Sequence, residues 1–141
     1  PRAETLILST TNGTRSIVAA AEACERVVLG ALLNLDAVAA HARESGVDYT
    51  VDCAGYKGAF AIDDAYCAGR IILLAGGERT DAAIAAELVA QSFPTAIDGI
   101  NARTYGPPGL EEDIAFCARE SVLDVVPRFS RMVGPAAEVV A

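Results

Sequence analysis

Two polar stretches hold the residues whose types and spacing best suit chemistry. The first reads STTNGT, and its small polar or flexible members are Ser9, Thr10, Thr11, Asn12, Gly13 and Thr14. Hydroxyl groups and closely spaced backbone N–H groups donate hydrogen bonds to phosphate or sulfonate. A plain turn fits part of the same stretch, because Asn-Gly favours tight turns and Thr14 could cap a helix. From these residues alone, an anion site and a turn are both open interpretations.

The second stretch reads YKGAFAIDD and spans residues 56–64. Asp63 and Asp64 are expected to open a helix, and paired carboxylates suit Mg²⁺, which takes one or two carboxylates together with water and substrate oxygens. Lys57 would add a positive charge beside them. The simpler interpretation is that the two carboxylates cap the helix or interact favourably with its dipole.

The four cysteines offer a weaker chemical alternative. They are far apart in the sequence, without a C-x-x-C pair, and the single histidine leaves no Cys/His set for zinc. Cys53 and Cys67 lie near the second stretch, so a cysteine-dependent hydrolase is a further hypothesis. No histidine partner is evident for Cys67, which favours a role in the core.

Composition narrows the function classes. The chain has 141 residues, of which 52% are hydrophobic and 21% charged, and its formal net charge is −8. That acidic balance, with scattered basic residues, argues against a nucleic-acid partner. No stretch approaches the roughly 20 apolar residues of a membrane helix, so we expect no membrane partner. Unpaired cysteines and the lack of a visible secretory leader lead us to expect a cytoplasmic protein.

Short apolar stretches alternate with helical patterns in the first part of the chain. We expect strands at 5–9, 26–30 and 48–55, with helices at 14–24 and 34–46 between them. This alternation predicts one α/β domain over residues 1–141, with three α/β/α layers and a mainly parallel sheet. Both polar stretches would then lie at the carboxyl edge of that sheet, where such folds bind ligands.

The rest of the chain is expected to be mostly helical. Helices are predicted at 63–77, 80–93 and 110–121, and the Pro- and Gly-rich residues 94–109 form a predicted loop. The tail, residues 123–134, is expected to hold one short strand that Pro127 limits to an edge of the sheet.

Three ordered motifs resemble those of a known family. STTNGT is followed by VVLGALLN at 27–34 and by VDCAGYKGAFAIDDAYCAG at 51–69, and DIAFCARESVLDVVP at 113–127 matches more loosely. Together they resemble the 2-phosphosulfolactate phosphatases of coenzyme M biosynthesis. The resemblance implies Mg²⁺-dependent hydrolysis of (2R)-2-phospho-3-sulfolactate, or a similar small anionic hydroxy acid, to sulfolactate and phosphate.

The chemistry of the two stretches agrees with this activity, and we assign their roles as a hypothesis. Residues 9–14 would hold phosphate or sulfonate, Asp63 and Asp64 would ligate or organise the metal, and Lys57 would neutralise substrate charge. Family members usually carry a further N-terminal segment, so we expect this chain to be the C-terminal part of a longer phosphatase. The alternative is a non-catalytic anion-binding or assembly module with an incomplete site, and association into a homo-oligomer is left open.

Overall fold

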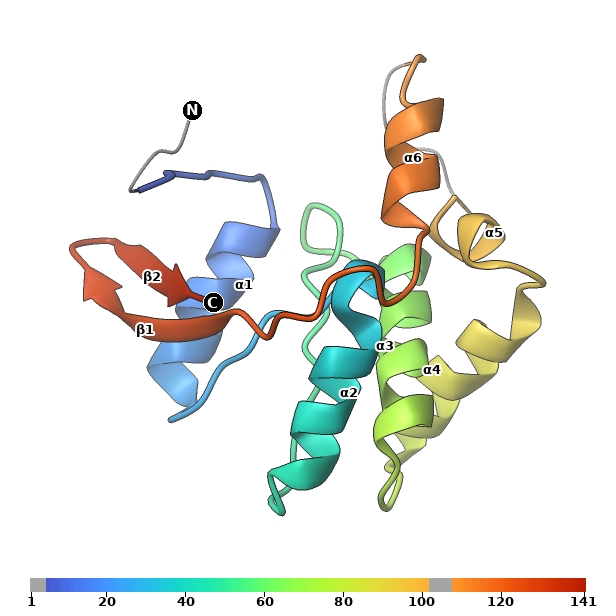
Figure 1. Cartoon of the computed structure of the whole chain (residues 1–141), viewed down its shortest axis with the longest axis horizontal. Helices are drawn as coiled ribbons and strands as arrows, with labels where there is room; N and C mark the ends of the chain where they lie inside the picture. The colour runs from blue at the N-terminus through green and yellow to red at the C-terminus, as the bar shows by residue number, and fades with distance from the viewer. Residues whose placement is uncertain (1–4, 102–107) are drawn as a thin grey trace.

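Helices make up most of the regular secondary structure in the computed structural model, which describes residues 5–101 and 108–141 (Figure 1). The elements in chain order are α1 (Gly13–Ala23), the 3-10 turn η1 (Leu32–Asn34), α2 (Leu35–Glu44), α3 (Ile62–Ala75), α4 (Asp81–Ser92), α5 (Ala96–Ile100), α6 (Glu111–Cys117), β1 (Arg128–Val133) and β2 (Ala136–Val140). None of the described helices is long and apolar enough to cross a membrane.

Helix α3 lies at the centre of the larger group of helices, packed against α2, α4 and α5. Its inward face carries Tyr66 and Ile71, which are 1% and 5% exposed. The Tyr66 ring meets the ring of Phe93 edge to face, with centroids 5.9 Å apart. The buried core cluster consists of Leu32, Leu35, Val38, Tyr66, Ile71 and Ala90. This core fixes the position of α3, and therefore of the two aspartates in its first turn.

Helix α1 and the β1–β2 hairpin form a second, smaller group (Figure 1). Two chain segments join it to the larger group and run side by side. The Leu29 N–H donates to the Pro127 carbonyl and the Phe129 N–H to the Val27 carbonyl, both at 2.9 Å. The buried side chain of Asn34 closes the junction: its amide donates to the carbonyls of Leu29 and Val125 at 3.1 and 3.0 Å.

The expected helices are confirmed where the apolar residues recur at helical spacing. The predictions for 14–24, 34–46, 63–77 and 80–93 correspond to α1, α2, α3 and α4. Helix α6 is shorter than the predicted 110–121 and ends at Cys117. The predicted loop at 94–109 contains the short helix α5, and its residues 102–107 lie outside the described part of the chain.

The three strands expected at 5–9, 26–30 and 48–55 are wrong for this structure. Residues 5–9 and 48–55 pair with no strand among the described residues. The isolated bridge between Tyr56 and Ala59 begins only after residue 55. Leu6, Ile7 and Leu8 are 71–90% exposed. Residues 26–30 contribute one isolated antiparallel bridge, between Val28 and Arg128. An apolar run becomes a strand only where another strand supplies a continuous row of hydrogen-bond partners, and among the described residues only this single bridge forms in these three runs.

The fold is therefore a mixture of helix and strand with a small antiparallel sheet of two strands. The parallel sheet that the alternating pattern predicts is not formed by the described residues. The short strand expected in the tail is confirmed, because β1 begins directly after Pro127. The sequence pattern did not predict its partner β2, and the two pair across a turn that contains Gly134, whose φ of 60° suits glycine.

Candidate functional site

The STTNGT stretch forms a compact loop at the start of α1. Thr10 and Thr14 bind each other across it: the Thr10 hydroxyl oxygen accepts from the Thr14 N–H at 3.1 Å, and the Thr14 hydroxyl donates to the Thr10 carbonyl at 3.0 Å. Asn12 occupies the N-cap position without a side-chain capping bond. The interpretation of Thr14 as the helix cap is therefore wrong, because Thr14 already lies in the first turn.

Several donors of this loop have no hydrogen-bond partner among the described residues. The backbone N–H groups of Thr11, Asn12 and Gly13 make no hydrogen bond within the part of the chain that the structure describes. The Asn12 carbonyl accepts from the N–H groups of Arg15 and Ser16, which fixes the loop backbone to the helix. Unpaired N–H groups at a helix N-terminus favour an anion, because they carry the positive end of the helix dipole.

The second stretch begins with a two-residue hairpin. Tyr56 and Ala59 exchange two backbone hydrogen bonds of 3.0 Å around Lys57 and Gly58, whose φ angles are 53° and 80°. Positive φ at both central residues defines a type I′ turn. Glycine adopts this conformation freely, but for Lys57 it costs about 1–2 kcal/mol. A strained residue of this kind often marks a functional position.

The hairpin is held at its base by Asp64. The Gly55 N–H donates to Asp64 Oδ2 at 2.6 Å. Gly55 has a φ of 70°, and a Cβ there would lie 2.6 Å from the Ala59 carbonyl oxygen, so only glycine fits. Partial burial raises the pKa of Asp64, the hydrogen bond from Gly55 opposes this rise, and the charge of Asp63 adds to it. The ionised carboxylate of Asp64 is therefore held at some cost in stability.

Asp63 has an unusual environment for a carboxylate. Its Oδ1 is buried and has no hydrogen-bond partner among the described residues. Neither aspartate caps α3, because Ala61 holds the N-cap position and makes no side-chain bond to the helix. The capping interpretation of the pair is therefore wrong, although both do lie in the first turn. A buried carboxylate oxygen without a partner is destabilising unless a ligand or water binds it.

One hydrogen bond joins the two loops. The Lys57 N–H donates to Asn12 Oδ1 at 3.1 Å, across 45 positions of sequence. The structure thus brings Asn12, Lys57 and, through Gly55, Asp64 into one continuous region. The Lys57 ammonium lies 5.1 Å from the centre of the Tyr56 ring and is open to solvent. Ser9 and Thr11 are exposed on the first loop and make no hydrogen bond to the hairpin.

The possible metal ligands in this region are few. Within residues 5–101 and 108–141, no group of three or more His, Cys, Asp or Glu side chains is placed to hold a metal ion. Mg²⁺ often keeps several waters and binds through only one or two carboxylates. Asp63 and Asp64 are accordingly the residues that could hold it, and the unpartnered Asp63 Oδ1 is compatible with that role.

The two nearby thiols are poorly suited to nucleophilic attack. Partial burial of its sulfur, followed by the charges of Asp64 and Asp52, raises the pKa of Cys53. Burial, with a further contribution from Asp64, raises the pKa of Cys67 to about 12. The thiolate is the reactive form of cysteine, and both environments disfavour it. This argues against the cysteine-dependent alternative.

We expect Cys67 to resist alkylation at pH 8 in the folded protein. With a pKa near 12, only about one thiol in ten thousand is ionised at that pH, and the fraction grows as the pH rises. Exposed Cys24 and Cys117 should react first with iodoacetamide, as peptide mass mapping would show. Modification of Cys67 as fast as Cys117 would contradict its burial and return it to the list of candidate nucleophiles.

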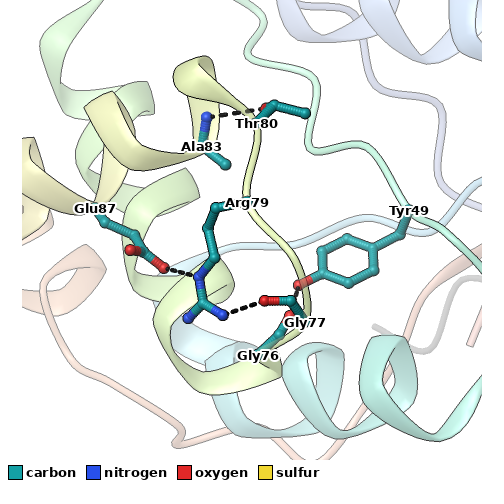
Figure 2. Close-up of polar contacts among 7 residues, drawn as sticks. All are labelled: Tyr49, Gly76, Gly77, Arg79, Thr80, Ala83 and Glu87. Carbon is teal, nitrogen blue, oxygen red and sulfur yellow. Dashed lines mark hydrogen bonds and ion pairs between the residues drawn. The ribbon is translucent and has the colours of Figure 1, made fainter.

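A separate groove of about 1000 Å³ lies between residues 46–53 and helices α3 and α4. Figure 2 shows contacts that involve lining residues, among them the hydrogen bond that the Tyr49 hydroxyl donates to the Gly76 carbonyl at 2.9 Å. Arg79 donates to Glu87 at 2.7 Å and to the Gly77 carbonyl, so its charge is already paired. Alanine is the commonest residue of the groove walls, which also carry the side-chain donors of Arg43, Thr50 and Thr80.

Gly55 and the Asn12–Lys57 bond are the features of this region that the sequence did not reveal. A signal for the hairpin was present, since a residue pair ending in glycine between Tyr56 and Ala59 suits a two-residue turn. The bond between loops had no such signal, because its partners are far apart in the chain.

Comparisons with known proteins agree on one family. A family model described as 2-phosphosulpholactate phosphatase matches residues 2–131. A 2-phosphosulfolactate phosphatase of Methanothermobacter thermautotrophicus is 36% identical over 130 residues, which cover 89% of this chain and 56% of that protein. Probable 2-phosphosulfolactate phosphatases of Caldanaerobacter subterraneus subsp. tengcongensis and Thermus thermophilus are 35% and 34% identical, over 90% and 93% of this chain.

The chain spans 56% and 59% of the lengths of these last two relatives, so it corresponds to somewhat more than half of the curated proteins that it matches. The family model nevertheless covers most of this chain, including both loops of the candidate site. The chain belongs to the 2-phosphosulpholactate phosphatase family.

Proposed function

We propose that the protein is a Mg²⁺-dependent phosphatase that hydrolyses the phosphate monoester of 2-phospho-3-sulfolactate, or of a similar small anionic hydroxy acid. The products would be sulfolactate and phosphate. The observation that carries this proposal is the Lys57–Asn12 hydrogen bond, which places the hairpin with its lysine beside the N-terminus of α1. The names of the related proteins support the substrate class.

The first loop suits an anionic group. The free N–H groups of Thr11, Asn12 and Gly13 and the exposed hydroxyls of Ser9 and Thr11 are donors without internal partners among the described residues. A phosphate or sulfonate accepts several such bonds at once. The neighbouring Lys57 ammonium would balance negative charge on the substrate. A substrate with two anionic groups can use both features together.

Asp63 and Asp64 are the proposed ligands of Mg²⁺. The buried Asp63 Oδ1 lacks a partner among the described residues. The Asp64 carboxylate accepts a hydrogen bond from Gly55, and partial burial disfavours its ionised form. A bound cation would supply the partner that Asp63 Oδ1 lacks and would stabilise the ionised form of Asp64. When bound, Mg²⁺ would supply stabilisation of the negative charge on the phosphoryl oxygens. The protein would hold the carboxylates in the first turn of α3.

Phosphate release is the direct test of this function. The chain would be incubated with 2-phosphosulfolactate in the presence of Mg²⁺ or EDTA, and inorganic phosphate would be measured. We expect release with Mg²⁺ and none with EDTA. Thermal stabilisation by phosphate would be recorded beside it, since a ligand that binds the folded state raises its stability. Release that EDTA leaves unchanged would contradict the metal requirement.

Replacing Lys57 with Asn should separate the effect of the lysine charge on activity from the effect of the turn conformation on stability. Asn-Gly is a preferred pair for a type I′ turn, so Lys57→Asn should stabilise the protein by about 0.5–1 kcal/mol in urea unfolding. It should also lower kcat/KM about tenfold, because the charge on the substrate loses its partner. Lys57→Arg keeps the charge and is the matched control. Unchanged kcat/KM in Lys57→Asn would show that the ammonium plays no part.

A second candidate function is a non-catalytic anion-binding or assembly module. The specific observation in its favour is the exposure of Leu6, Ile7 and Leu8 in a chain that spans little more than half of its relatives. Such a module would bind phosphate or associate with another chain, including a second copy, without hydrolysis. Phosphate-dependent stabilisation with no phosphate release would select it.

The three-layer α/β/α fold with a mainly parallel sheet is also part of this proposal. Residues 5–9 and 48–55 run without strand partners among the described residues, as strands of a larger α/β/α sheet would if their neighbours were supplied by other residues (Figure 1). A place in coenzyme M biosynthesis and a cytoplasmic setting also stay predictions of the family resemblance and of the sequence.

A further inference from the structure

The Lys57 N–H needs a partner from outside its own hairpin. The turn is closed by the N–H groups of Tyr56 and Ala59, which bond to each other's carbonyls. The N–H of Lys57 points to neither of these, and Asn12 Oδ1 accepts it at 3.1 Å. The side-chain carbonyl of Asn12 is thus engaged by the protein itself.

Asn12 is well placed to act as a fixed anchor. Its backbone carbonyl accepts from the N–H groups of Arg15 and Ser16, at 3.1 and 3.2 Å, so the residue is part of the first turn of α1. Its side chain reaches from there to the hairpin. The hairpin is consequently held at two points, at its base by Asp64 through Gly55 and at its tip by Asn12.

The strain at Lys57 makes this anchor significant. A lysine in the left-handed region tends to return to an extended or helical conformation unless its surroundings oppose the change. The bond from Asn12 opposes it, because the bond fixes the Tyr56–Lys57 peptide plane relative to which φ of Lys57 turns. Without Asn12, the tip of the hairpin would lose the hydrogen bond that joins it to the first loop.

We infer that Asn12 is a positioning residue, whose side-chain carbonyl holds the Lys57 hairpin against the N-terminus of α1. The two loops then form one unit, and the unpaired N–H groups of the first loop and the ammonium of Lys57 address the same anion. The positioning of an anion rests on the proposed function, whereas the contact between the loops does not. This role differs from the direct substrate contact that the sequence suggested for Asn12.

Lys57 is the chain's one lysine, which allows a clean test of the contact. A lysine-specific endoprotease can cut only between Lys57 and Gly58, and it needs the hairpin to open before it can bind the backbone. The rate of this single cleavage therefore reports how firmly the hairpin is held. Lys57→Arg, which lacks the cleavage site, serves as the blank.

Three variants of the first loop would be compared with the unaltered chain. Asn12→Ala removes the acceptor and should speed cleavage on the order of tenfold, the effect of losing one hydrogen bond. Asn12→Asp keeps an acceptor oxygen and a good helix N-cap, so it should restore a rate close to that of the unaltered chain. Thr11→Ala changes the same loop without touching the bond, and its rate should also be unaltered.

The outcomes distinguish this inference from a general loss of stability. Fast cleavage in Asn12→Ala alone supports the positioning role, since a merely disturbed loop would not be rescued by Asp. Equal rates in all variants, or fast cleavage in both Asn12 variants, would overturn it. The proteolysis needs no turnover, so absence of phosphate release would count against the proposed function and leave this result intact. If the chain hydrolyses substrate, kcat/KM should fall in Asn12→Ala together with the rise in cleavage.

Discussion

Asp63→Asn is expected to make the ligand-free protein more stable and to remove most of its Mg²⁺-dependent phosphate release. The buried Oδ1 of Asp63 has no hydrogen-bond partner in the described residues, and it lies beside a second carboxylate, Asp64. An unsatisfied buried polar atom costs about 1–3 kcal/mol, and more when it is charged. Asparagine keeps a polar side chain but removes its charge, and a charged group is the more costly one to leave without a partner, so the free energy of unfolding should rise by about 1 kcal/mol in urea without Mg²⁺.

The same substitution removes a proposed ligand. We expect kcat/KM to fall about 100-fold or more, which is the scale of losing one group that stabilises charge in the transition state. Stabilisation by Mg²⁺ in the urea experiment should disappear with it, giving a readout that does not depend on turnover. Opposite changes in stability and activity are what a destabilised functional residue shows.

Asp113→Asn is the matched control for this prediction. Asp113 also lies in the first turn of a helix, α6, but it is exposed to solvent. Its replacement should change stability by less than about 0.5 kcal/mol and leave phosphate release unaltered. If Asp63→Asn lowered stability and retained full Mg²⁺-dependent release, Asp63 would be a structural residue and the proposed metal ligands would be wrong.

The largest loss of stability is expected from Gly69→Ala, which should lower the free energy of unfolding by about 3 kcal/mol. Gly69 lies where α3 crosses α4, and a Cβ there would come 2.1 Å from the Ala86 carbonyl oxygen and 2.8 Å from the Ala90 Cβ. One of these contacts is with helix backbone, which cannot rotate away. The two helices would have to separate, and the core around Tyr66 would loosen with them. Urea unfolding followed by circular dichroism would measure the change.

Gly13→Ala adds the same methyl group to another helix and provides the comparison. A Cβ at Gly13 would meet only the hydroxyl of Thr10, at 3.3 Å, near the molecular surface. The gain in helix propensity opposes this mild crowding, so stability should change by less than about 1 kcal/mol. Similar losses in the two variants would mean that the α3–α4 contact is looser than the structure has it.

Local sequence patterns were sufficient for the helices α1 to α4, although they missed the short helix α5. Helix α2 could be predicted from its apolar spacing and from Gly46, which ends it with a φ of 66°. Helix α3 followed from the apolar run after Asp63 and Asp64. Helical hydrogen bonds join residues four apart, so the pattern and the structure draw on the same short segment. Strands at 5–9 and 48–55 were overpredicted because a strand also needs a partner strand, which a local apolar pattern does not specify.

The candidate site was predictable in its members but not in its connections. The residue types of STTNGT and of the Asp63–Asp64 pair indicate anions and Mg²⁺ by their chemistry alone. The bond from Lys57 to Asn12 spans 45 positions, and no local pattern specifies it. Gly69 is another such case, since only the neighbouring helix shows why a side chain is excluded there. Contacts between segments that are distant in sequence explain both the Lys57–Asn12 bond and the need for glycine at position 69.

Joint binding of one anion by residues 9–14 and the Lys57 hairpin can be observed residue by residue. The ¹⁵N-labelled chain would be titrated with inorganic phosphate, and backbone amide shifts would be followed with and without Mg²⁺. We expect the amides of Thr11 and Gly13 to shift together with those of Lys57 and Gly58, and all four to give one dissociation constant. Shifts confined to one loop, or no shift in either, would contradict a shared anion site.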